Sequence, residues 1–161
     1  MKTRVQFVLI FVLAFFGLSL ILSQKANPDD QLIFGLKRIQ EKAFLNFKSS
    51  PVEKVDYMSA LLDNRLRELS NVVKNKNYDY VLPAASRYST TAGQITELII
   101  ANNLRDKVED TKNQFLAHLQ VLQEIYVIYP KNFDDEEYKY IEDDINYLKI
   151  YLDKLGDYAK E

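Results

Sequence analysis

Apolar residues recur along most of the chain at the spacing of an amphipathic helix. The first series is Leu32, Leu36, Ile39, Ala43 and Phe47. Similar series run through residues 55–73, 85–99, 104–129 and 138–155. This period places the apolar side chains on one face of a helix. Because no stretch alternates as a strand does, we predict an all-α fold, an antiparallel bundle of four to five amphipathic helices.

The ends of several helices are marked in the sequence. Ser50 is the expected N-cap of the second helix, with Pro51 in the first helical position and Glu53 completing a capping box. The last helix is expected to begin at Asp134, because Glu137, three residues on, repeats the capping-box spacing. Both starts are predictions about local hydrogen bonds.

The middle of the third predicted helix is a run of small and β-branched residues, Ser89-Thr90-Thr91-Ala92-Gly93. These residues are weak helix formers. They favour either the close approach of a neighbouring helix or a kink. A hydrolase nucleophile would need elbow glycines on both sides of the serine, and the run lacks them.

The amino-terminal segment has a different pattern. The run Val5–Leu22 is apolar apart from three uncharged residues, and it follows Lys2 and Arg4. Eighteen helical residues extend over about 27 Å, close to the hydrocarbon thickness of a bilayer. The run is long for a signal peptide and lacks a small-residue cleavage site, which favours a retained anchor. A cleaved signal and a buried core helix are the alternatives.

This pattern gives a domain layout and an orientation. We expect a transmembrane signal-anchor in residues 1–23, a linker in residues 24–31 and a helical bundle in residues 32–161. Lys2 and Arg4 precede the apolar run, so the positive-inside rule leaves the amino terminus in the cytoplasm. The predicted location is the cytoplasmic membrane, with the bundle on the extracytoplasmic side.

Charge and composition narrow the classes of function. The chain has 21 basic and 23 acidic residues, a net charge of −2. The absence of a basic tract argues against nucleic-acid binding. The chain has no cysteine, which rules out disulfides and thiolate metal sites. We predict no cofactor and no metal.

His118 and a set of acidic residues are candidates for a ligand or metal site. His118, the single histidine, falls at the edge of the predicted apolar stripe, and a boundary position is the favoured interpretation. The acidic residues of Asp134–Glu137 and Glu142–Asp144 have carboxylates that suit a divalent cation. They lack the spacing of a calcium loop, so a solvated helix start and face are favoured.

Tyrosines form a second stripe on the last predicted helix. Its members are Tyr140, Tyr147, Tyr151 and Tyr158. Boundary tyrosines that pack on a neighbouring helix are one interpretation. An exposed strip that binds a protein partner is the other, because tyrosine is a good interface anchor. These four residues are the candidate binding site.

Short motifs resemble those of a known family. They are Leu36-Lys37-Arg38 with Glu41-Lys42, Ser50-Pro51-Val52-Glu53-Lys54, Arg65-Leu66-Arg67-Glu68-Leu69, His118-Leu119-Gln120-Val121-Leu122 and Tyr129-Pro130. Over residues 30–130 the chain is similar to a bacterial family of domains of unknown function. Its members are membrane-anchored or extracytoplasmic helical proteins, some of them the outer part of anti-sigma factors. The resemblance implies architecture and location, and it implies no catalytic residue.

Together these features predict a non-catalytic binding protein of the cell envelope. The expected role is a scaffold, adaptor or sensor part, and the protein is not expected to be an enzyme. Its expected partners are the lipid bilayer, through the amino-terminal helix, and an envelope protein. A small-ligand sensor or carrier with a pocket between the helices is the alternative function.

Overall fold

The computed structural model describes residues 31–131 and 136–160, in which helices are joined by short turns and no strand is present. The α-helices are α2 (Gln31–Phe47), α3 (Pro51–Lys74), α4 (Val81–Ala101), α5 (Val108–Ile128) and α6 (Tyr138–Tyr158). The short 3-10 helices η1 (Tyr78–Tyr80) and η2 (Arg105–Lys107) precede α4 and α5. The predicted all-α fold is confirmed. Of the described helices, none has the length and apolarity that crossing a membrane requires, and Val5–Leu22 lies outside the described residues.

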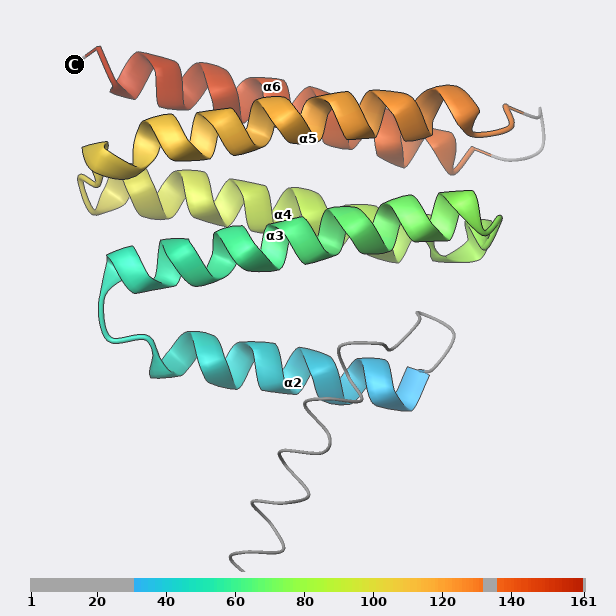
Figure 1. The fold of residues 1–161 in the computed structure, drawn as a ribbon, viewed down its shortest axis with the longest axis horizontal. Coiled ribbons are helices and arrows are strands. Elements are labelled where there is room, and N and C mark those ends of the chain that lie inside the picture. Colours follow the sequence, from blue (N-terminus) through green and yellow to red (C-terminus); the bar gives the residue numbers. More distant parts are fainter. Residues whose placement is uncertain (1–30, 132–135, 161) are drawn as a thin grey trace, which may run out of the picture. The chain divides into compact units, whose positions relative to one another are not determined.

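The chain divides into two units, Met1–Phe47 and Lys48–Glu161. In the first unit the structure describes α2, a single amphipathic helix of 17 residues. The second unit is the four-helix bundle of α3, α4, α5 and α6 (Figure 1). The bundle therefore builds its core from four helices without α2.

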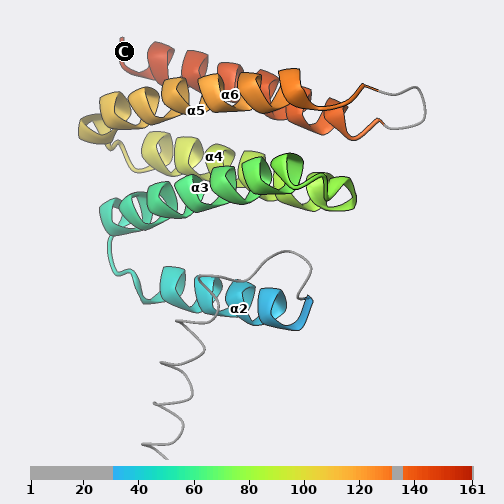
Figure 2. The same cartoon turned by 45° about the vertical axis from the view of Figure 1, so that its right-hand side comes forward.

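Helices that follow one another in the bundle run in opposite directions, as Figures 1 and 2 show. In the hairpin of α3 and α4, Arg65 bonds Thr91 while Glu68 pairs with Arg87, so sequence numbers rise on one helix and fall on the other. The helices α5 and α6 form a second hairpin, and Tyr126 lies against Tyr138 near its turn. The predicted antiparallel order thus holds within each hairpin.

The two hairpins meet along pairs of parallel helices. Across α3 and α5, Ser59 faces Gln114 and Asp63 faces His118. Across α4 and α6, Ser89 bonds Asp144 and Gly93 lies against Tyr151. In both pairs the numbers rise together, which places α4 diagonally opposite α5. The amphipathic stripes gave no sign of these parallel pairs.

The core of the bundle consists of the predicted apolar stripes. Its largest fully buried side chains include Leu62, Leu69, Tyr88, Ile95, Ile99, Phe115, Leu122, Ile125, Ile141, Leu148 and Leu155. Each of the four helices contributes to this set. Burial of a leucine- or phenylalanine-sized side chain stabilises a fold by about 1.5–3 kcal/mol, so these positions supply most of the driving force for folding.

The start of α3 follows the predicted cap with one difference. The Ser50 hydroxyl accepts a hydrogen bond from the Glu53 backbone N–H at 3.1 Å, and Pro51 occupies the first helical position. The Glu53 carboxylate, however, accepts from the backbone N–H and the hydroxyl of Ser49. These bonds lower the pKa of Glu53. A backbone hydrogen bond from Ser50 also lowers this pKa, so the reciprocal half of the capping box is present, with Ser49 as an additional donor.

The start of α6 differs more from the prediction. The helix begins at Tyr138, and Glu137 precedes it without a side-chain capping bond. Asp134, the predicted first residue, lies outside the described residues. The first backbone bonds run from Lys139 to Glu136 and from Tyr140 to Glu137, a tight turn of the i to i+3 type. The prediction that Glu137 lies inside the first turn of the helix was wrong.

Small residues in α4 admit α6 closely. A Cβ atom on Gly93 would lie 2.7 Å from the Tyr151 hydroxyl oxygen, closer than real Cβ contacts allow. Ala92 is also fully buried, and α4 continues unbroken through Ser89–Gly93. Of the two predicted outcomes, close approach of a neighbouring helix is the one found.

Candidate functional site

The four predicted tyrosines of α6 divide into two pairs. Tyr151 and Tyr158 are partly buried against other helices, whereas Tyr140 and Tyr147 are exposed. The Tyr158 hydroxyl donates a hydrogen bond to the Asn103 side chain, and the Arg105 guanidinium lies 4.9 Å from the centre of its ring. Tyr151 and Tyr158 are therefore in contact with other parts of the bundle, as boundary tyrosines are.

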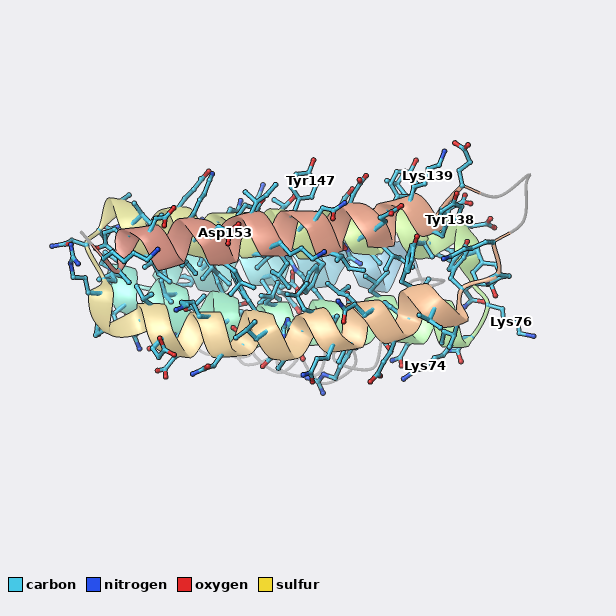
Figure 3. All side chains as sticks on the ribbon, turned by 90° about the horizontal axis from the view of Figure 1, so that it is seen from above. Lys74, Lys76, Tyr138, Lys139, Tyr147 and Asp153 are labelled. Atoms are coloured by element: carbon cyan, nitrogen blue, oxygen red, sulfur yellow. The ribbon has the colours of Figure 1, made fainter. Side chains whose placement is uncertain are left out.

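Tyr151 also supports one member of the exposed pair, Tyr147. Its hydroxyl end rests against Gly93, and burial raises its pKa. On its other side it stacks with Tyr147, with ring centres 6.3 Å apart and planes inclined by 16°. Tyr147 points away from the bundle in Figure 3. The contact of Tyr151 with Gly93 thus holds an exposed aromatic ring in a defined position.

We call the exposed part of this helix the α6 outer face and define it by Tyr140, Tyr147 and Ile150. Tyr147 and Ile150 are each 48% exposed. Ile150 was not predicted as part of this surface, because the predicted stripe contained tyrosines alone. The three-residue spacing between Tyr147 and Ile150 could have indicated that the two side chains share a helix face.

A polar groove lies between α3 and α5, on the open side of the bundle. It encloses about 460 Å³. Lining residues that carry polar or charged groups are Asp56, Ser59, Asp63, Lys107, Asp110, Thr111, Gln114 and His118. We call it the α3–α5 groove. Among these residues, only His118 was considered as a site from the sequence. The others come together because α3 and α5 are parallel neighbours, which the sequence did not predict.

Hydrogen bonds cross the α3–α5 groove at three levels. Lys107 Nζ donates to Asp56 Oδ1 at 2.7 Å, which raises the pKa of Lys107. Further along both helices, the Gln114 side-chain amide donates to the Ser59 carbonyl at 2.9 Å. At the third level, the imidazole of His118 forms a hydrogen bond with the carboxylate of Asp63. The two helices are therefore joined by polar side chains more than by close packing.

His118 connects this groove to the core. It is only 7% exposed, deeper than the boundary position predicted for it. Its Nε2 lies 2.9 Å from Asp63 Oδ1, and its Nδ1 lies 3.1 Å from the Tyr88 hydroxyl. Burial lowers the pKa of His118, and the Asp63 carboxylate only partly offsets this. A neutral ring satisfies all three groups, with Nε2–H donating to Asp63 and the Tyr88 O–H donating to Nδ1.

Asp144 is the fourth titratable group of this layer and the least expected. Asp144 was predicted to lie on a solvated acidic face, but it is 2% exposed, so that prediction was wrong. Burial raises its pKa to about 8, against the opposing effect of a hydrogen bond with Ser89. Within the described chain its Oδ2 has no hydrogen-bond partner. Asp144 also raises the pKa of buried Tyr88, after the larger effect of burial.

The bundle thus carries one titratable residue per helix in a single layer. Asp63 of α3 lies at the surface, while Tyr88 of α4, His118 of α5 and Asp144 of α6 are buried. Both ring nitrogens of His118 are held in protein hydrogen bonds. In this arrangement the histidine joins α3, α4 and α5 together.

Histidine and acidic side chains are also possible ligands of a metal ion. Within residues 31–131 and 136–160, no three histidine or acidic side chains lie close enough to hold a metal ion. Of the acidic residues considered for a divalent cation, Asp134 and Asp135 lie outside the described residues. Glu136 pairs with Lys139 at 2.7 Å, an ordinary surface contact at the start of a helix.

Comparison with known proteins gives one match. The model of a family described as a domain of unknown function, DUF5667, matches residues 25–132, most of the chain. The match covers α2, α3, α4 and α5 and ends before α6. No curated protein and no solved structure matches the chain.

Proposed function

The chain belongs to the DUF5667 family, and from this premise we propose that it is a membrane-anchored binding protein of the cell envelope and not an enzyme. Residues 1–23 anchor it, the bundle lies outside the cytoplasmic membrane, and a protein partner binds the α6 outer face. The observation that carries the proposal is the exposed, supported position of Tyr147.

The chemistry of the α6 outer face suits a protein partner. Tyrosine combines a large apolar ring with a polar tip and loses little conformational freedom on binding, which makes it a frequent interface residue. Tyr147 is already positioned by Tyr151, so less entropy is lost when a partner covers it. Tyr140 and Ile150 extend the apolar surface along the same helix.

The position of this face relative to the family match supports a partner that is specific to this protein. The matched segment ends at residue 132, and the α6 outer face lies beyond it. The shared part of the family would supply three bundle helices and α2. The fourth helix would supply the contact that differs between members.

A second candidate function rests on the α3–α5 groove. Its volume of about 460 Å³ falls within the range of small-molecule pockets, about 300–1,000 Å³. Asp63 and Asp56 keep about half of their side-chain surface exposed there. A small polar ligand that replaces the bonds of Lys107 and Gln114 would make the bundle a sensor or carrier.

Site-specific photo-crosslinking separates these possibilities. A photoreactive phenylalanine analogue replaces Tyr147 in the full-length, membrane-bound chain, and the control places it at Leu116, a 50% exposed residue of α5. We expect a discrete protein adduct from position 147 and none from position 116. The variant Tyr147→Ser should lose its partner while the melting temperature stays within about 2 °C, as for surface substitutions.

Three results would contradict the proposal. Equal adducts from both positions would mean non-specific contact, and no adduct from either would remove the partner. Unfolding of Tyr147→Ser would make the residue part of the core. A thermal-shift screen of polar metabolites tests the second candidate, and a hit that Lys107→Ala and Gln114→Ala abolish would favour the groove.

A further inference from the structure

Helix α2 has the composition of a helix that lies on a membrane surface. Its sequence, from Gln31 to Phe47, contains three basic residues, Lys37, Arg38 and Lys42, and one acidic residue, Glu41. The remaining residues are mostly apolar and include Phe34, Phe44 and Phe47. Basic amphipathic helices rich in phenylalanine and leucine are typical of the lipid–water interface.

Three large apolar side chains of α2 are exposed in its described part. Ile39 is 68% exposed and Phe47 is 83% exposed, and Phe44 is exposed as well. Gln40 is the one buried side chain among residues 39–47. At about 100° per residue, Ile39, Phe47 and Phe44 lie within an arc of about 140°, and the buried Gln40 lies between Phe47 and Phe44 in this arc. Large apolar side chains in such an arc need a cover, because their exposure to water is unfavourable.

The charge of α2 indicates the chemistry of that cover. Lys42 is exposed and lies about 60° beyond Ile39, at the edge of the apolar arc. A lysine in this position can bury its methylene chain in the interface and keep its ammonium group among lipid phosphates. The excess of basic over acidic residues favours an anionic surface.

The length of the connecting chain also permits this placement. Eight residues, 23–30, separate Leu22 from the first residue of α2. A chain of eight residues spans at most about 27 Å when fully extended. If residues 1–23 are anchored as the proposed function holds, α2 begins within reach of the membrane surface.

We propose that α2 lies flat on the outer surface of the membrane, with Ile39, Phe44 and Phe47 in the interface and its basic residues on anionic phospholipid headgroups. This goes beyond the anchor itself, because it gives the chain a second, parallel contact with lipid. The bundle, a separate unit, then begins at the membrane surface.

The absence of cysteine makes a direct test simple. Single cysteines replace Ile39, Phe47 or Lys42 in the full-length chain, and each carries a nitroxide spin label. The labelled protein is reconstituted into vesicles of phosphatidylcholine with phosphatidylglycerol and into vesicles of phosphatidylcholine alone. Oxygen collides with labels in lipid, and a water-soluble nickel chelate collides with labels in water.

We expect labels at residues 39 and 47 to be several-fold more accessible to oxygen relative to nickel than the control label at residue 42, which lies at the edge of the apolar arc, at the level of the headgroups. The difference should be larger in the anionic vesicles. The double variant Lys37→Glu with Lys42→Glu should return the label at residue 47 to water. Circular dichroism before and after reconstitution checks that the bundle remains folded in each variant.

Other outcomes overturn the inference in recognisable ways. Nickel accessibility at all three positions would place α2 in water, and low accessibility to both reagents would place its apolar side against protein. Vesicle flotation tests the proposed anchor separately. Chains that float while residue 47 stays in water contradict only the inference. Flotation that needs anionic lipid and disappears in high salt supports α2 and contradicts the anchor, and chains that never float contradict both.

Discussion

The bundle joins its two hairpins along two pairs of parallel helices, and these pairs are built in opposite ways. Between α4 and α6 the contact is close, because Gly93 and Ala92 leave room for Tyr151. Between α3 and α5 the contact is open, and a groove of about 460 Å³ remains. There the helices are connected by His118, Gln114 and Lys107 through hydrogen bonds.

This difference shows how side-chain size decides which pair of helices packs closely and which pair leaves a groove that a ligand can enter. Parallel neighbours align their helix dipoles unfavourably, so a close parallel pair needs compensation from packing. The pair α4 and α6 obtains it from small residues. The pair α3 and α5 leaves a groove between its helices, which makes it the side where a ligand has access and where single polar contacts contribute little.

The largest expected effect comes from closing the space at Gly93. In Gly93→Val the new side chain meets the Tyr151 ring, so the free energy of unfolding should fall by about 2–3 kcal/mol, the upper part of the range for overpacking. Chemical denaturation monitored by circular dichroism measures it. Gly156→Val is the matched control, because a Cβ there meets nothing within 4 Å. Equal losses at both glycines would mean that α4 and α6 are not in close contact.

A smaller effect, of opposite sign, is expected at Asp144. Its folded pKa of about 8 lies above its ordinary value of 3.8, so the folded state binds more protons between these values. Its contribution to stability is complete below about pH 3.8 and is lost as pH rises through 8. Asp144→Asn should therefore be more stable than wild type at pH 8.5, by about 1 kcal/mol or about 4 °C in melting temperature.

The exposed neighbour Asp143 gives the control for this prediction. Asp143→Asn should keep most of the wild-type pH dependence, weakened slightly because the Asp143 charge also raises the pKa of Asp144. A wild-type stability that does not fall between pH 5 and pH 8.5, relative to Asp144→Asn, would show that Asp144 is charged or solvated in the folded protein.

The smallest expected effect lies on the open side. In Asp63→Asn the folded protein should lose less than about 1 kcal/mol, because Asp63 is half exposed and an amide oxygen can still accept from His118. The pKa of His118 should fall further, since the carboxylate that opposes the effect of burial is gone. His118 is the single histidine, so its imidazole NMR signals give the titration directly.

The sign of the His118 contribution follows from the same data. Its folded pKa is below the ordinary 6.5, so its contribution to stability is present above pH 6.5 and is lost as pH falls below that value. A His118 pKa at or above 6.5 in wild type would contradict the buried, neutral ring. A large loss of stability in Asp63→Asn would show that the open side is as well packed as the closed one.

Local patterns in the sequence predicted the helices and most of the core. The apolar stripes place Leu62, Ile95 and Leu148 inward, and the structure buries all three. Ser50 and Pro51 mark the start of α3 correctly, because a cap depends on neighbours three residues away. The start of α6 was placed too early, since an acidic residue followed by glutamate at the right spacing also occurs in a plain turn.

Contacts between distant residues could not be predicted in this way. His118 is buried because Tyr88, 30 residues earlier, bonds its ring. Tyr147 and Tyr151 lie on the same helix with similar spacing, yet only Tyr151 finds a glycine opposite it. Which helices become parallel neighbours decides both cases, and a stripe on one helix carries no information about its neighbour.

The diagonal placement of α4 and α5 has a consequence for how the protein folds. Each hairpin is made of contacts between residues near in sequence, whereas both parallel pairs join residues about 50 to 60 positions apart. Local contacts form early, because they require closure of shorter loops. Each hairpin should therefore form first, and the two should dock in a late step. A hairpin that docks late can also dock onto another copy of the chain, so the connection through η2 is the natural hinge for exchange of hairpins between molecules.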